Sequence, residues 1–140
     1  MIVPFVDFKS SYKEIEKEIL PEIKRVLEIG DYILRDDVEK FEKNLADYVG
    51  TKYAIGVNSG TDALFLSLKA LGIGSGDEVI TSGYTFWATI EAIINCGATP
   101  VLVDIGEDLL IDIKEIEKKI TNKTKAILPV NIGGAVCNME

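Results

Sequence analysis

The sequence of 140 residues contains no histidine. A Ser-His-Asp triad or a zinc site with histidine ligands therefore cannot be assembled from this chain alone. Acid–base chemistry near neutral pH would need a carboxylate, lysine or tyrosine with a shifted pKa, or a cofactor. This absence narrows the enzymatic mechanisms that are open to the chain.

Cysteines and positive charge are also scarce. The two cysteines, Cys96 and Cys137, lack CxxC spacing, so we expect reduced thiols and a cytoplasmic protein. Lys and Arg number 15 against 23 Asp and Glu, a net charge of −8, without a basic cluster. We expect no nucleic-acid partner, because binding to the phosphate backbone needs a basic surface. No apolar run has the length of a membrane span and no signal-peptide pattern opens the sequence, so we expect no membrane partner.

What is present is a hydrophobic content of 47%, enough for a substantial core. Apolar residues at helical spacing predict helices over Tyr12–Ile29, kinked or divided at Pro21, and over Asp37–Val49. From residue 51 onward, short apolar runs alternate with helical patterns. This alternation predicts an α/β fold with mostly parallel strands, preceded by a helical segment over residues 1–50. We expect strands at Tyr53–Val57, Glu78–Thr81, Thr99–Val103 and Lys125–Val130, and helices near Thr61–Leu71, Thr85–Asn95 and Ile113–Ile120.

The stretch Asn58-Ser59-Gly60-Thr61 lies where the first expected strand passes into a helix. Free amides at a helix start, together with the helix dipole, suit a phosphate. Gly60 would let the backbone approach an anion, and the hydroxyls of Ser59 and Thr61 could donate to it. The alternative is that Ser59 only caps the helix. Asp62 would repel a phosphate unless its side chain points away.

A second motif, Tyr84-Thr85-Phe86-Trp87, follows the next expected strand. The carboxyl ends of parallel strands share one edge of a sheet, so this motif should project from the same edge as the first. Its aromatic rings could stack on a flat ligand, or they could pack into the core.

Together these stretches resemble the DegT/DnrJ/EryC1/StrS aminotransferases, pyridoxal-phosphate enzymes that aminate keto sugars carried on nucleotides. The resemblance extends over essentially the whole chain. It is carried by VPFVDF (3–8), GDYIL (30–34), VEKFE (38–42), YAIGVNSGTDAL (53–64), LGIGSGDEVIT (71–81), YTFWAT (84–89), GATPVLVDI (97–105) and TNKTKAILPV (121–130).

The resemblance implies a role for each matching residue. Gly60 and Thr61 would hold the phosphate of pyridoxal 5'-phosphate with Ser59 close by, and Phe86 would stack on the pyridine ring. The whole chain, residues 1–140, would be a single partial domain: the N-terminal part of the large domain of a fold-type I transferase, with a β/α portion over residues 51–140. The full-length enzyme would use a nucleotide-sugar substrate and an amino donor, which the resemblance implies is glutamate, and would form a homodimer.

The sequence also departs from the family pattern. Arg35-Asp36 follows GDYIL where the family usually has a glycine, in a loop that lies near the substrate and the dimer contact in the family. The segments that supply the Schiff-base lysine, the acid that pairs with the pyridine nitrogen and a neighbouring glutamine have no match here. We therefore expect no catalytic residue in this chain, and no activity from it alone.

Two other hypotheses stay open: a non-catalytic binding or assembly module that keeps the phosphate site, and an unrelated flavodoxin-like binder of phosphate esters. In the family fold, strands that come later in the chain separate the first strand from the next three. We therefore expect unpaired strand edges and association of the isolated chain.

Overall fold

The computed structural model describes residues 3–139. The chain divides into two compact units, Met1–Gly56 and Val57–Glu140, called here the N-terminal unit and the C-terminal unit. Within the described residues, no helix combines the length and apolar character that a membrane crossing requires. The sequence-based division at residue 50 within a single domain stays a prediction.

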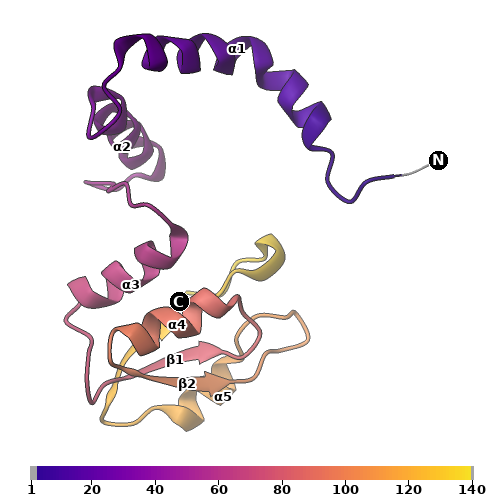
Figure 1. Cartoon of the computed structure of the whole chain (residues 1–140). Coiled ribbons are helices and arrows are strands. Elements are labelled where there is room, and N and C mark those ends of the chain that lie inside the picture. The colour runs from indigo at the N-terminus through magenta and orange to yellow at the C-terminus, as the bar shows by residue number, and fades with distance from the viewer. Residues whose placement is uncertain (1–2, 140) are drawn as a thin grey trace. The chain divides into compact units, whose positions relative to one another are not determined.

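The N-terminal unit begins with α1 (Phe8–Ile29), a helix that starts earlier than the sequence predicts. The side chain of Asp7 caps it by accepting a hydrogen bond from the Ser10 amide, and Gly30 ends it in a left-handed conformation (φ 73°). Pro21 lies inside this single helix instead of dividing it. Figure 1 shows α1 curving along its length, as a proline that removes one backbone hydrogen bond would cause.

The second helix, α2 (Asp36–Val49), agrees with its predicted bounds to within one residue. Asp36, Asp37 and Glu39 lie in its first turn, where negative charge complements the helix dipole. Gly50 ends α2 with a φ of 79°, a conformation that glycine adopts without steric cost. The chain turns there toward the segment that precedes the first motif.

The C-terminal unit is an α/β arrangement built on three parallel strands, as the sequence predicts. Its elements in chain order are α3 (Gly60–Ala70), β1 (Glu78–Ser82), α4 (Trp87–Asn95), β2 (Thr99–Val103), α5 (Ile113–Lys119), β3 (Thr124–Leu128) and the short 3-10 helix η1 (Ile132–Gly134). The strand order is β2-β1-β3, and β1 pairs in parallel with both neighbours. Ile80 of β1, for example, lies opposite Val101 and Ile127.

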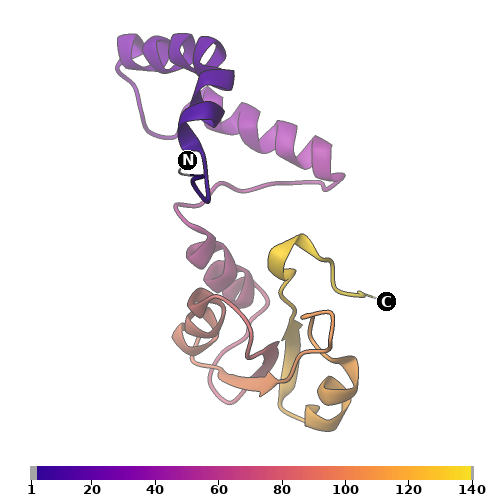
Figure 2. The ribbon, with the colours of Figure 1, turned by 90° about the vertical axis from the view of Figure 1, so that its right-hand side faces the viewer.

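The core lies on both faces of this sheet because successive residues of β1 point to opposite sides. Val79 packs with residues of α3 and α4, whereas Ile80 packs with Val103 and Ile116 on the side of α5. Val79 and Ile80 are both fully buried. Figure 2 shows α4 and α5 on opposite sides of the sheet. The expected α/β fold, with helices flanking a parallel sheet, is therefore confirmed.

One predicted strand, Tyr53–Val57, is wrong for this structure: these residues have no regular secondary structure. Tyr53 and Ile55 are 71% and 81% exposed. A strand forms only when its amides and carbonyls pair with a neighbouring strand, and residues 3–139 supply no such partner to this segment. The apolar composition of residues 53–57 is consistent with a strand, but composition alone does not supply the neighbouring strand with which it would have to pair.

Candidate functional site

The first motif forms the start of α3, with Ser59 as its N-cap. The Ser59 hydroxyl accepts a hydrogen bond from the Asp62 amide at 3.1 Å. The next backbone bond at this end runs from the Ala63 amide to the Ser59 carbonyl. Among the described residues, the amides of Gly60 and Thr61 have no partner. Two N–H groups at the positive end of a helix are thus available to an anion.

Gly60 has open space around it. A Cβ atom built on this residue would meet no atom within 4 Å, and its φ is not in the left-handed region. Neither packing nor backbone conformation therefore requires a glycine here. Its lack of a side chain leaves the neighbouring amides accessible, which is the property that binding an anion would demand.

Asp62 does not point away from this helix start. The Ser59 Oγ also donates a hydrogen bond to the Asp62 Oδ2, at 3.0 Å, so the carboxylate turns back toward the cap. Ser59 therefore caps the helix, which both interpretations of this stretch allow. A phosphate at Gly60 and Thr61 would compete with this carboxylate for the same positive helix end.

The second motif connects β1 to α4. The Ser82 hydroxyl donates to the Tyr84 carbonyl at 3.1 Å, and the hydroxyls of Thr85 and Thr89 lie 2.9 Å apart. Phe86 is the N-cap of α4, with an extended backbone and a carbonyl that accepts the Thr89 amide. The Phe86 residue is 76% exposed and belongs to neither core cluster. Within the described chain, its ring is therefore available for a ligand.

Both motifs lie at one end of the C-terminal unit. Helix α3 packs against α4. In Figure 1, both helices begin at the end toward which β1 and β2 point. This is the sheet edge at which open α/β folds bind ligands. The structure thus brings the expected phosphate-binding and ring-stacking residues to the same edge.

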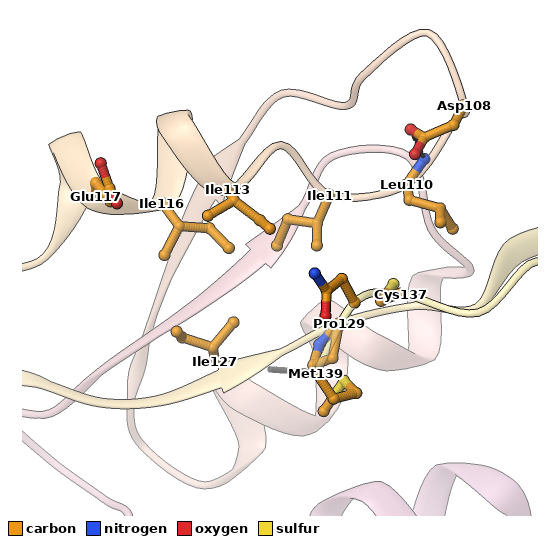
Figure 3. A pocket seen from close by; sticks show the side chains of 11 residues that line it. Asp108, Leu110, Ile111, Ile113, Ile116, Glu117, Ile127, Pro129, Cys137 and Met139 are labelled. Atoms are coloured by element: carbon orange, nitrogen blue, oxygen red, sulfur yellow. Dashed lines mark hydrogen bonds between the residues drawn. The ribbon is translucent and has the colours of Figure 1, made fainter.

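A cavity of the C-terminal unit lies away from both motifs. A cavity of about 320 Å³ lies beside α5 (Figure 3). Its lining is mainly apolar, from Ile113 and Ile116 of α5 to Ile127 of β3 and Met139, and its ionisable carboxylates belong to Asp108 and Glu117. Such a lining offers nothing to neutralise a phosphate, so we do not assign the site to this cavity.

The acidic loop after β2 has a local structural role. The Asp104 carboxylate accepts the Ile105 amide at 2.9 Å, and the Asp108 carboxylate accepts the Leu110 amide at 3.1 Å. Asp112 caps α5 through the Lys114 amide. These carboxylates shape the loop and the helix start, and none of them is placed at the two motifs.

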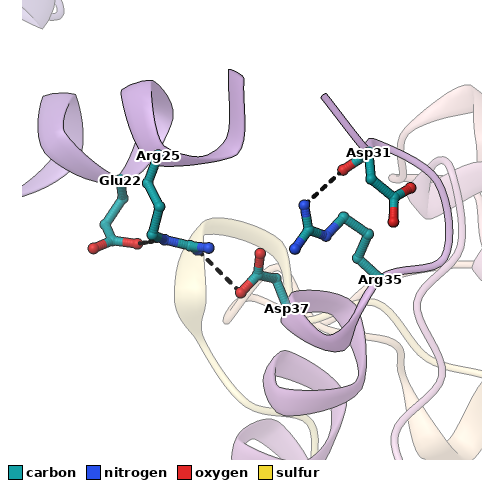
Figure 4. Close-up of polar contacts among 5 residues, drawn as sticks. All are labelled: Glu22, Arg25, Asp31, Arg35 and Asp37. Atoms are coloured by element: carbon teal, nitrogen blue, oxygen red, sulfur yellow. Dashed lines mark hydrogen bonds and ion pairs between the residues drawn. The ribbon is translucent and has the colours of Figure 1, made fainter. Parts of the chain in front are cut away.

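In the N-terminal unit, Arg25 forms one ion pair within α1 and one that joins α1 to α2 (Figure 4). The Arg25 guanidinium lies 2.8 Å from Glu22 and 3.0 Å from Asp37 of α2. The hydrogen bond from Arg25 lowers the pKa of Asp37. Arg35, which precedes α2, donates to the Asp31 carbonyl at 2.9 Å and so stabilises its own loop.

Sequence analysis gave no role to Glu42, yet its carboxylate accepts the Gly56 amide at 2.6 Å. Gly56 immediately precedes Val57-Asn58, which lead into the first motif. Glu42 is the last residue of VEKFE (38–42), one of the stretches that carry the family resemblance. That stretch is the one sequence feature that pointed to this glutamate.

Comparison with known proteins identifies the family to which the chain belongs. The DegT/DnrJ/EryC1/StrS aminotransferase family matches residues 13–140. The dTDP-3-amino-3,6-dideoxy-alpha-D-galactopyranose transaminase of Aneurinibacillus thermoaerophilus is 47% identical over 140 residues, which cover 99% of this chain and 39% of that protein.

Two solved structures are also similar. S. venezuelae DesV, in complex with a ketimine intermediate, has a TM-score of 0.94 and 46% identity, over 98% of this chain and 37% of that one. NtdA from Bacillus subtilis, with the bound cofactor PMP, has a TM-score of 0.87 and 39% identity, over 93% of this chain and 30% of that one. The chain thus spans about a third to two-fifths of the length of the curated relatives it matches.

Proposed function

The chain belongs to the DegT/DnrJ/EryC1/StrS aminotransferase family, and from this premise we propose that it is the N-terminal part of an enzyme that aminates a nucleotide-linked keto sugar with pyridoxal phosphate as cofactor. Its two units would belong to the large domain of that enzyme. The observation that carries the proposal is the pair of unpartnered amides at Gly60 and Thr61, at the same sheet edge as the exposed ring of Phe86.

The chemical groups at this edge of the sheet match those of pyridoxal phosphate. The amides of Gly60 and Thr61 would bind its phosphate, the Thr61 hydroxyl could add a donor, and the ring of Phe86 would stack on the flat pyridine. Ser59 would orient the helix start through its bond to the Asp62 amide. When bound, the cofactor supplies an electron sink that allows an amino group to be moved between carbon atoms. The contribution of this chain is to bind and orient it.

The substrate class follows from the chemistry that the relative's name records. That transaminase is named for an amino group on ring carbon 3 of a dTDP-linked sugar. Transamination installs an amino group on a ring carbon that was a ketone, so the corresponding substrate is a keto sugar on a nucleotide. We propose the same class here, with glutamate as amino donor and a homodimer as the assembly. The proposed location is the cytoplasm, where buried unpaired thiols such as Cys96 and Cys137 persist.

We further propose that the 140 residues alone do not catalyse transamination, because no lysine among them stands in a context that matches the family's Schiff-base lysine. The experiment is an absorbance titration of the 140-residue chain with pyridoxal phosphate, followed by borohydride reduction and peptide mapping. We expect weak binding that inorganic phosphate competes away, without one stoichiometrically labelled lysine. A single labelled lysine would contradict the proposal and point to a self-sufficient activity.

The phosphate site itself is tested with Gly60→Ala. The added Cβ has open space within the protein, so the fold should be retained while the amides become less accessible to an anion. We expect weaker binding of pyridoxal phosphate by the chain and by a longer aminotransferase polypeptide that carries it. The matched control is Gly74→Ala, outside α3 and both motifs, whose added Cβ would meet no atom closer than 3.7 Å, an ordinary van der Waals distance. Unchanged affinity in Gly60→Ala would remove the phosphate site from the proposal and favour the helix-cap interpretation.

A further inference from the structure

The segment between α2 and α3 is held by few hydrogen bonds. Thr51 is anchored at its amide, which donates to the Ala46 carbonyl, and its hydroxyl donates to the Tyr53 carbonyl at 3.1 Å. For residues 54–58, the described chain provides one hydrogen bond to the backbone, from the Gly56 amide to the Glu42 carboxylate. Its acceptor is a carboxylate, 2.6 Å from the amide nitrogen, and hydrogen bonds to ionised acceptors are shorter and stronger than those between neutral groups.

The Glu42 carboxylate extends from one face of α2. Val38, Glu42 and Ala46 are spaced four residues apart and therefore share one face of the helix. Ala46 is buried, and its carbonyl accepts the amides of both Gly50 and Thr51 as the chain turns back. A Cβ added to Gly56 would lie 3.4 Å from Glu42 Oε1 and 3.8 Å from Val38 Cγ1. The segment thus returns along this face of α2.

We propose that Glu42 is a positioning residue for the anion-binding turn at Asn58–Thr61. A fixed Gly56 amide restrains the backbone two residues before Asn58 and four before Gly60, so fewer conformations compete with the one that presents free amides. This inference rests on the proposed function, because it assumes that the turn binds the phosphate of the cofactor.

The chemistry of Glu42 separates positioning from contact with a ligand. A carboxylate accepts hydrogen bonds and repels a phosphate, so Glu42 would act through the Gly56 amide and not on the anion itself. Glutamine keeps an acceptor oxygen on a side chain of the same length but lacks the charge. Alanine removes the acceptor altogether. The two substitutions therefore distinguish the loss of the hydrogen bond from the loss of the charge.

The test is amide NMR on the 140-residue chain, with and without pyridoxal phosphate. We expect Glu42→Ala to speed hydrogen exchange at the Gly56 amide by about tenfold or more, as the loss of a hydrogen bond to a charged group implies. It should also shift the resonances of Asn58–Thr61 and reduce their response to pyridoxal phosphate. Glu42→Gln should retain most of the Gly56 protection and of the response.

The matched control is Glu39→Ala, which removes the same charge from the same helix at a side chain without a hydrogen bond among the described residues. Its Gly56 exchange and its Asn58–Thr61 resonances should match those of the wild type. The amides of Val79 and Ile93 report on the core and should be unchanged in every variant. Normal Gly56 exchange and unshifted Asn58–Thr61 resonances in Glu42→Ala would overturn the inference.

The two proposals can fail separately. If the wild-type amides of Gly60 and Thr61 do not respond to pyridoxal phosphate or to inorganic phosphate, the proposed cofactor site is wrong. The shifts that Glu42→Ala causes at Asn58–Thr61 without ligand then still decide whether Glu42 positions this turn. If the wild type responds and Glu42→Ala responds equally, the cofactor site stands and the positioning role is wrong.

Discussion

Replacing Phe86 with alanine should separate cofactor binding from stability. Phe86 is 76% exposed, so only about a quarter of its surface contributes to folding. Full burial of such a side chain is worth roughly 1.5–3 kcal/mol, and a quarter of that is about 0.4–0.8 kcal/mol. Stacking on a flat ring is worth roughly 0.5–1.5 kcal/mol beyond burial, which corresponds to a loss of roughly 2- to 12-fold in affinity for pyridoxal phosphate.

The assay pairs denaturant unfolding of the 140-residue chain with a cofactor titration of the longer aminotransferase polypeptide that we propose. Phe65→Ala is the matched control for stability because Phe65 packs against the core formed by α3, α4 and the sheet. It should destabilise the chain by about 2–4 kcal/mol, since it is only partly buried. A loss of that size in Phe86→Ala, or unchanged cofactor affinity, would show that Phe86 serves packing and not the ligand.

Two further predictions concern charge. Asp62→Asn keeps an acceptor for the Ser59 hydroxyl but removes the negative charge that competes with a phosphate for the start of α3. The affinity for phosphate, measured by isothermal titration, should therefore rise about 2- to 5-fold. A decrease would mean that the carboxylate helps to form the site. The Ser10 hydroxyl and amide lower the pKa of Asp7, the cap of α1. A lowered pKa in the folded state stabilises the helix above the ordinary aspartate value, and this contribution is lost as the pH falls through the folded pKa. The Ser10 hydroxyl donates to the Asp7 carboxylate at 2.7 Å, so the carboxyl carbon of Asp7 should titrate at a lower pH in the wild type than in Ser10→Ala. Equal midpoints would refute the contribution of this hydroxyl.

The local sequence was enough to predict most of the secondary structure. Short apolar runs predicted β1, β2 and β3 because a strand that is covered by helices on both faces of the sheet carries apolar residues on both sides. The spacing of apolar residues predicted α2, and the glycine at position 50 predicted its end. The abrupt change from apolar run to helix at Ser59 identified the candidate phosphate site, since a cap followed by a glycine is visible in a few consecutive residues.

Only the tertiary structure decided the features that depend on a partner far along the chain. The run Tyr53–Val57 has the composition of a strand, yet it pairs with nothing among residues 3–139, and Glu42 holds its Gly56 amide instead. The sequence also left the orientation of Asp62 and the exposure of Phe86 undetermined, because each depends on which residues lie next to the side chain in the folded protein. Sequence patterns record the preference of each segment, whereas hydrogen-bond partners and exposure are properties of the assembled chain.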